Sequence, residues 1–189
     1  MTLLEQLTAY VPCCEQEEKD RQILLSWLRS GQDVFTRKNP AAHFTASAWV
    51  VSPDRQQVLL IYHNIYHSWS WMGGHADGET DLLAVAQREV QEECGLSQVR
   101  VVSPEIFSLE ILTVDGHNKR GQYVPSHLHL NVTYLFEADP GAAVAIKPDE
   151  NSGVGWFALS DLGQAVSEPW MLERVYEKLC RKVSGLSSL

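Results

Sequence analysis

Basic side chains are scarce in this chain. Fifteen Lys and Arg stand against 24 Asp and Glu, which gives a formal net charge of -9 at pH 7. Non-specific binding to nucleic acid or to an anionic membrane requires a basic surface, so the composition argues against both. An anionic substrate would need local compensation, which divalent cations held by acidic side chains can supply.

Cysteine is also sparse. The four cysteines are Cys13, Cys14, Cys94 and Cys180. They lack the paired spacing of a metal site, and a disulfide between the neighbouring residues Cys13 and Cys14 would be an unlikely structural link in a chain of this length. We therefore expect reduced thiols.

Long apolar runs are missing as well. No stretch approaches the roughly 18 apolar residues of a membrane-spanning helix, and the N-terminus lacks the basic start and apolar core of a secretory signal. These absences predict a soluble cytoplasmic protein. The 189 residues, 44% of them hydrophobic, suffice for one well-cored domain with an appended element.

Residues 1–40 predict a helical extension ahead of the main domain, which we place at residues 41–189. Helices are expected at Leu3 to Ala9 and at Glu17 to Arg29, where apolar residues share one helical face. Asn39-Pro40 ends this pattern. The extension is expected to pack on the domain, and the sequence leaves open whether it shapes a substrate pocket or contacts a second subunit in a homodimer.

The rest of the chain predicts strands around one central helix. A hairpin is expected from Phe44 to Val51 and Gln57 to Tyr62, joined by a turn-forming run. Further expected elements are strands at Val99 to Leu112, Leu128 to Glu137 and Gly155 to Leu159, and a helix at Pro169 to Val183. This order indicates an α/β (α+β) protein with a mixed sheet between helices, and simple parallel winding is less suited to it.

The segment from Gly73 to Leu96 carries the strongest functional signal. Residues three and four apart share a helical face, so Glu89 lies beside both Glu92 and Glu93, where like charges repel. Clustered carboxylates are the hard oxygen ligands that suit Mg²⁺ or Mn²⁺, although an acidic helix face is also common as a merely solvated surface. Gly73 and Gly74 favour this metal-binding interpretation, because they permit a tight turn and close backbone approach.

This constellation resembles the Nudix box: Gly, five residues, Glu, seven residues, Arg-Glu, an aliphatic residue, any residue, Glu-Glu, any residue, Gly and an aliphatic residue. Its second half matches at Arg88, Glu89, Val90, Glu92, Glu93, Gly95 and Leu96, and Gly74 precedes Arg88 by the required fourteen positions. The first Glu departs from the pattern, since Thr80 occupies its place and Glu79 lies one residue early. We expect a tightened loop or a shifted helix start that lets Glu79 reach Arg88.

The resemblance implies a Nudix-like α/β/α sandwich and a metal-dependent hydrolase. It implies Glu92 and Glu93 as principal Mg²⁺ ligands, with Mn²⁺ as a substitute, and Glu89 as a ligand or as the group that orients the attacking water. The backbone carbonyl of Gly73 would complete the shell, and Arg88 would orient the carboxylates. Nudix hydrolases commonly recruit another acidic group from a distant loop, for which we choose Glu150 over its neighbour Asp149.

The implied reaction is cleavage of a diphosphate (pyrophosphate) linkage in a nucleoside diphosphate derivative by metal-activated water. The implied partner is therefore a small phosphorylated, nucleotide-like molecule. Two alternatives remain: a catalytically silent domain that binds a nucleotide or partner, which the displaced Glu79 motivates, and an isoprenoid diphosphate isomerase, for which no supporting cysteine and glutamate constellation is evident. The sequence does not identify the leaving group, the phosphorus attacked or the number of metals.

Other chemistry-bearing residues favour structural roles. The aromatic run from Tyr62 to Trp71 could stack on a base, but such side chains more often pack a sheet edge. Histidines occur at His63, His67 and His75 and again at His127 and His129 without a compact ligand pattern, so zinc is not expected.

Overall fold

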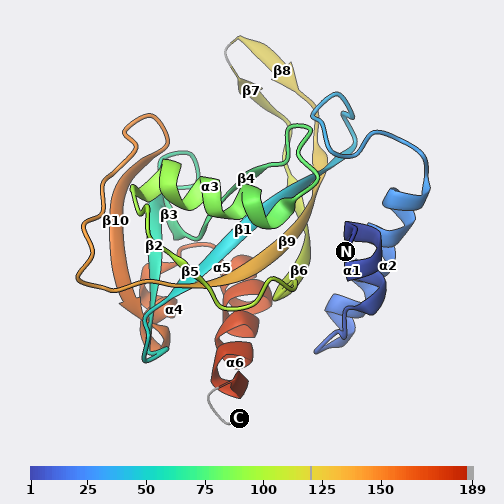
Figure 1. Cartoon of the computed structure of the whole chain (residues 1–189). Coiled ribbons are helices and arrows are strands. Elements are labelled where there is room, and N and C mark those ends of the chain that lie inside the picture. Colours follow the sequence, from blue (N-terminus) through green and yellow to red (C-terminus); the bar gives the residue numbers. More distant parts are fainter. Residues whose placement is uncertain (120, 187–189) are drawn as a thin grey trace.

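The fold is a mixed sheet enclosed by helices. The computed structural model describes residues 1–119 and 121–186, so residues 187–189 of the expected domain lie outside the described residues. Helix α3 (Leu82–Cys94) covers one face of the sheet, and the C-terminal helices cover the other (Figure 1). The predicted α/β sandwich with an N-terminal helical extension is confirmed. No helix in the described part of the chain combines the length and apolarity needed to span a bilayer.

Strand β1 (Ala42–Val51) is the centre of the sheet. It pairs in parallel with β9 (His127–Glu137) along its whole length. On its other side it pairs antiparallel first with β4 (Met72–His75) and then with β2 (Gln57–His63). The remaining strands of this sheet are β3 (Ser68–Ser70), β5 (Arg100–Val101), β6 (Ser108–Val114) and β10 (Asn151–Ala158). One parallel pair among antiparallel pairs makes the sheet mixed, as the sequence predicts.

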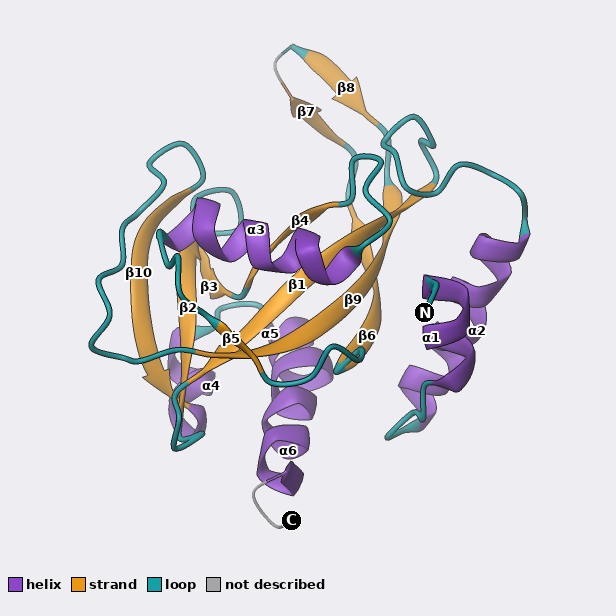
Figure 2. Ribbon diagram, in the orientation of Figure 1, coloured by secondary structure: helices purple, strands orange, loops and turns teal. Residues whose placement is uncertain are grey.

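A separate hairpin and two groups of helices complete the fold (Figure 2). Strands β7 (His117–Lys119) and β8 (Gln122–Val124) pair with each other in a separate two-stranded sheet and project from the body. The N-terminal helices are α1 (Leu3–Ala9) and α2 (Glu15–Arg29), and α2 lies along β6. At the other end of the chain, a short turn (Leu159–Asp161) leads into α4 (Leu162–Ala165), and α5 (Pro169–Met171), a π-helical turn (Leu172–Tyr176) and α6 (Glu177–Leu186) follow.

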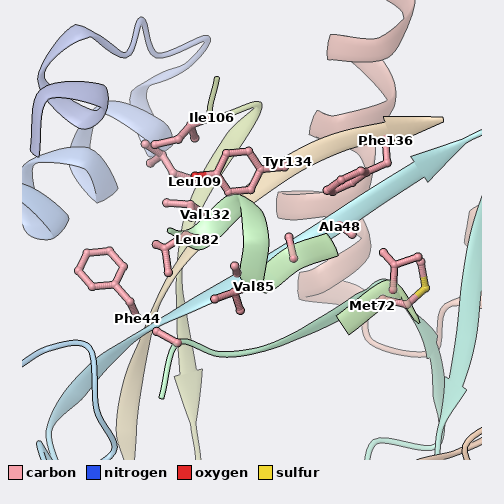
Figure 3. Packing of buried hydrophobic residues seen from close by; sticks show 14 of the residues in the cluster. Phe44, Ala48, Met72, Leu82, Val85, Ile106, Leu109, Val132, Tyr134 and Phe136 are labelled. Atoms are coloured by element: carbon pink, nitrogen blue, oxygen red, sulfur yellow. The ribbon is translucent and has the colours of Figure 1, made fainter. Parts of the chain in front are cut away.

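Alternation along the strands divides the interior into two cores. Even-numbered residues of β1, such as Phe44 and Ala48, face α3 together with Val132 and Tyr134 of β9 (Figure 3). Odd-numbered residues near the end of β1, such as Trp49, pack against the C-terminal helices. Because successive strand side chains point to opposite faces, a single strand serves both cores.

The same odd-numbered face carries a buried polar network between the two ends of the chain. Glu17 of α2 accepts hydrogen bonds from Ser108 Oγ at 2.9 Å and Lys182 Nζ at 2.8 Å. Lys178 Nζ lies 3.0 Å from Glu110 and 3.5 Å from Glu17. Glu17 and Glu110 are both fully buried, so their charges depend on these partners. The network therefore fixes the N-terminal helices to α6 and to the sheet.

This network predicts acid-sensitive stability. Burial alone would raise the pKa of Glu17, but the Cys13 N–H and the ammonium groups of Lys182 and Lys178 outweigh it and lower the pKa to about 2. A carboxyl with a lowered folded-state pKa stabilises the fold above its ordinary pKa, and this contribution is lost as the pH falls towards the folded value. We expect the free energy of unfolding to fall between about pH 4.5 and pH 2. Urea unfolding across this range measures it, and in Glu17→Gln this part of the pH dependence should be absent; an unchanged slope would contradict the assignment.

The structure corrects several predicted elements. The strand expected from Val99 to Leu112 is two strands, β5 and β6, because the segment between them contains Pro104, which cannot donate to a ladder. Strands β3 and β4 were not predicted. In the case of β4, the strand includes the two glycines that we assigned to a turn. The helices expected at Leu3 to Ala9 and Glu17 to Arg29 are confirmed, the second with two more residues at its start. The division of the chain at residue 41 stays a prediction.

Candidate active site

Helix α3 presents the acidic cluster. Asp81 caps its first turn, accepting a hydrogen bond from the Ala84 N–H at 3.1 Å, and Gly95 ends it in the left-handed conformation with φ of 74°. Val85, Ala86 and Val90 are fully buried on the face that meets the sheet. This packing fixes which way the glutamates of the last two turns point.

Strand β4 brings the two glycines against this helix. A Cβ on Gly73 would lie 2.7 Å from Ser47 Oγ and 2.8 Å from the Ala46 carbonyl oxygen. A Cβ on Gly74 would lie 2.6 Å from both carboxylate oxygens of Glu89. Backbone leaves no room for a side chain at Gly73, and a side chain at Gly74 would displace the Glu89 carboxylate, so the glycines allow the strand to approach both β1 and the acidic helix.

Glu93 is the most buried member of the cluster. Its side chain accepts a hydrogen bond from the Gly73 N–H at 2.8 Å, and the residue is 4% exposed. Burial, helped by the nearby carboxylates of Glu89 and Glu150, raises the pKa of Glu93 to about 8 against the opposing effects of that hydrogen bond and of Lys147. A carboxyl in this setting gains most from a nearby cation.

Glu89 and Glu92 flank Glu93 on the same helix. Burial raises the pKa of Glu89, and the charge of Glu92 raises it as well. Arg88 Nη2 lies 3.3 Å from Glu89 Oε1, and Arg88 Nε lies 3.7 Å from Glu92 Oε1. Arg88 thus contacts the two outer carboxylates of the cluster, in line with an orienting role.

The loop from Lys147 to Asn151 places Glu150 beside the helix. Buried Asn151 donates a hydrogen bond to the Glu93 carbonyl oxygen at 2.8 Å and accepts one from the Lys147 N–H at 3.2 Å. Lys147 Nζ lies 3.0 Å from Glu150 and 3.7 Å from Glu92. The sequence reasoning missed Lys147 and Asn151, although both stand in the same short polar run as Glu150.

The charge balance of this group suits a divalent cation. Glu89, Glu92, Glu93 and Glu150 are four carboxylates, and the cations in ion-pair distance among the described residues are Arg88 and Lys147. Two negative charges are therefore uncompensated when all groups are ionised. Mg²⁺ keeps several waters and takes only one or two carboxylates directly, so these ligands need not converge on one point.

Glu79 does not make the predicted ion pair with Arg88. Its carboxylate accepts hydrogen bonds from the backbone N–H groups of Thr80 at 2.7 Å and Asp81 at 2.9 Å. These bonds lower the pKa of Glu79, with a smaller contribution from the charge of Arg88. The helix begins only at Leu82, so Glu79 stabilises the loop before it.

The expectation that the histidines form no compact group is wrong. Nitrogen atoms of His43, His75 and His129 all lie within 4.8 Å of one another, and His127 Nε2 lies 3.2 Å from His129 Nε2. Burial, with smaller contributions from the neighbouring histidines, lowers the pKa of His129 to about 2. The signal in the sequence was the alternation of His127 and His129, which places both on one strand face.

The aromatic run before the glycines is largely structural, as predicted. Trp71 is 8% exposed and packs edge-on against Tyr176 at a ring distance of 5.5 Å. Trp69 contacts Tyr62 and Phe157. Tyr66 differs, because it is 51% exposed and pairs with His63 in a loop whose Asn64 N–H donates to the Glu150 carbonyl oxygen at 3.0 Å.

Comparison with known proteins agrees with this geometry. The family model described as NUDIX domain matches residues 42–179. A search of curated protein sequences finds no match.

Solved structures show the same fold. A hydrolase of the NUDIX family from Clostridium perfringens is 20% identical with a TM-score of 0.53, covering 76% of this chain and 97% of its own. The Ap4A hydrolase of C. elegans is 19% identical with a TM-score of 0.50, covering 77% and 97%. The dihydroneopterin triphosphate pyrophosphohydrolase of E. coli is 13% identical with a TM-score of 0.54, covering 77% and 97%.

Proposed function

We propose that this chain, which belongs to the Nudix family and is a pyrophosphohydrolase, cleaves a diphosphate linkage in a nucleoside diphosphate derivative. Its cofactor is Mg²⁺, and Mn²⁺ can substitute for it. The observation that carries this proposal is the cluster of four carboxylates, in which Glu93 accepts the Gly73 N–H, Glu89 lies against Gly74, and burial raises the pKa of Glu93 to about 8. The C. elegans protein, an Ap4A hydrolase, supports a nucleotide-like substrate, and the E. coli protein, which acts on dihydroneopterin triphosphate, supports cleavage of a phosphoric anhydride.

The residues of the cluster have distinct proposed roles. Glu92, Glu93 and the Gly73 carbonyl hold the metal, with Glu89 and Glu150 as further ligands. When bound, a divalent cation neutralises phosphate charge and activates water for attack on phosphorus. Arg88 keeps Glu89 and Glu92 in position through the contacts at 3.3 and 3.7 Å.

Glu150 is also suited to receiving the proton of the attacking water. Its side chain is 42% exposed, whereas Glu93 is almost completely covered, so solvent can take the proton away afterwards. Lys147 Nζ, 3.0 Å from Glu150, holds this carboxylate beside the cluster, where a base must lie within reach of the proton it takes. The same ammonium group is close enough to the cluster to contact a substrate phosphate when its ion pairs rearrange.

A substrate screen tests the proposal. We expect hydrolysis of one subset among canonical and damaged nucleotides, nucleotide sugars, dinucleotides and ADP-ribose, only with Mg²⁺ or Mn²⁺ present, and with one water added to the products by mass. The products should be two phosphate-containing fragments, or a monophosphate plus pyrophosphate. Tight binding without turnover would support a silent binding domain, and an isoprenoid diphosphate product of unchanged mass would support an isomerase; either result contradicts the proposal.

A further inference from the structure

We propose that His43, His75, His127 and His129 form a second metal site, for a transition-metal ion of the Zn²⁺ class, separate from the acidic cluster. The four residues come from three strands: His43 from β1, His75 from β4, and His127 and His129 from β9. Imidazole nitrogens suit zinc and similar ions, whereas Mg²⁺ prefers oxygen ligands. The ligand chemistry therefore separates this site from the carboxylates.

Backbone pairing brings the four rings together. His43 and His129 are direct partners in the parallel ladder between β1 and β9, and His75 is the partner of Thr45 in the antiparallel ladder between β1 and β4. The His43 ring lies 4.8 to 5.2 Å from the other three ring centroids. Because the strands hold these positions, little conformational freedom is lost on binding.

The nitrogen distances match those of metal ligands. Two nitrogens bound tetrahedrally to zinc at about 2.0–2.1 Å are separated by roughly 3.3 Å. His127 Nε2 and His129 Nε2 lie 3.2 Å apart. Ligand atoms of His43, His75 and His129 lie within 4.8 Å of one another, which small side-chain rotations can close.

Hydrogen bonds on the far side of two rings set the required tautomer. His43 Nδ1 lies 3.3 Å from the Asn39 carbonyl oxygen, and His127 Nδ1 lies 2.8 Å from the Pro125 carbonyl oxygen. A carbonyl only accepts, so each Nδ1 carries the proton and each Nε2 presents a lone pair. His43 Nε2 is buried and has no hydrogen-bond partner among the residues that the structure describes. An unsatisfied buried acceptor is costly, and a metal ion would satisfy it.

The site lies next to the acidic cluster along the chain but faces the other way. The missing Cβ of Gly74 points at Glu89, and the following residue, His75, points to the opposite side of β4. A metal bound there would join β4 to β1 and β9. It would therefore stabilise the strand that carries Gly73 and Gly74.

Cobalt binding tests this site on the full chain. In excess Mg²⁺, which occupies oxygen ligands, we expect Co²⁺ to bind at one equivalent with the visible absorption of a tetrahedral nitrogen site, and Zn²⁺ to displace it. His43→Gln and His129→Gln should each weaken binding at least about 100-fold, more than the loss of an outer-shell partner does. Zn²⁺ should raise the Tm of the wild type and leave the Tm of both variants unchanged.

Two controls make the result specific. His117→Gln removes an exposed histidine of the β7–β8 hairpin and should bind Co²⁺ as the wild type does. Glu93→Gln should also keep the cobalt spectrum, so failure of the proposed hydrolase function would leave this test intact. Circular dichroism verifies folding, and His127→Gln replaces any variant that does not fold. No cobalt spectrum in the wild type, or wild-type affinity in folded His43 and His129 variants, would overturn the proposal.

Discussion

Glu93→Gln is expected to lower kcat/KM at least about 100-fold, beyond the 10- to 100-fold typical of outer-shell partners of a metal. The substitution keeps the size of the side chain, and the amide oxygen can still accept the hydrogen bond of the Gly73 N–H. It removes only the negative charge. Because Glu93 is 4% exposed and its carboxylate accepts the Gly73 N–H, the substitution leaves this buried side of the cluster without its negative charge.

Stability and metal affinity distinguish this loss from misfolding. Burial disfavours the charged form of Glu93, so the metal-free Gln variant should unfold at the same Tm as the wild type or above it. Its apparent Mg²⁺ affinity, taken from activity against metal concentration, should fall. Glu173→Gln, an exposed substitution outside the cluster, should change neither quantity. Full activity in Glu93→Gln would contradict the metal assignment.

Helical spacing predicted that the three glutamates of α3 lie together. Glu89, Glu92 and Glu93 are within four residues of one another, so their shared position follows from the helix alone. The reach of Glu79 could not be predicted in this way, since it depends on where the helix starts. Asp81 caps α3, and Glu79 is left outside the helix, bonded to the loop backbone.

Contacts between distant segments of the chain were harder to predict from the sequence. The choice of Glu150 rested on the resemblance, whereas its position depends on Asn151, which bonds to the Glu93 carbonyl oxygen 58 residues away. The histidine group depends on strand register, because His43 meets His129 only when β1 and β9 pair in parallel at that alignment. Neither the order of strands nor their register is encoded in a local pattern.

The buried ion network could not be predicted from the sequence for the same reason. Glu17 is a first-turn glutamate of α2, where an acidic residue normally faces solvent and interacts with the helix dipole. In the fold it meets Lys178 and Lys182 from the opposite end of the chain. The network continues through Glu110 to Asn131, which accepts a hydrogen bond from Ser47, the residue facing Gly73. The N-terminal helices are thereby connected to the strand at the active site.

Lys178→Met is expected to destabilise the protein by about 3–5 kcal/mol, the usual cost of removing one partner of a buried ion pair. The ammonium group lies 3.0 Å from Glu110 and 3.5 Å from Glu17 and donates to the Leu109 carbonyl oxygen at 3.1 Å. Lys182 still pairs with Glu17, but Glu110 is fully buried and makes no other ion pair among the described residues. Since domains are stable by only about 5–15 kcal/mol, the loss should be plain in urea unfolding.

A second substitution identifies the cause of this loss. If the unpaired carboxylate is responsible, Lys178→Met combined with Glu110→Gln should be more stable than Lys178→Met alone, because no buried charge is then left without its partner. Arg181→Met is the matched control on the same helix. Its side chain is 68% exposed and lies 3.8 Å from Glu177, so we expect a change within about 0.5 kcal/mol. Equal unfolding midpoints for Lys178→Met and Arg181→Met would show that α6 is held by its apolar face, through Leu179 and Val183, and that the ion network contributes little.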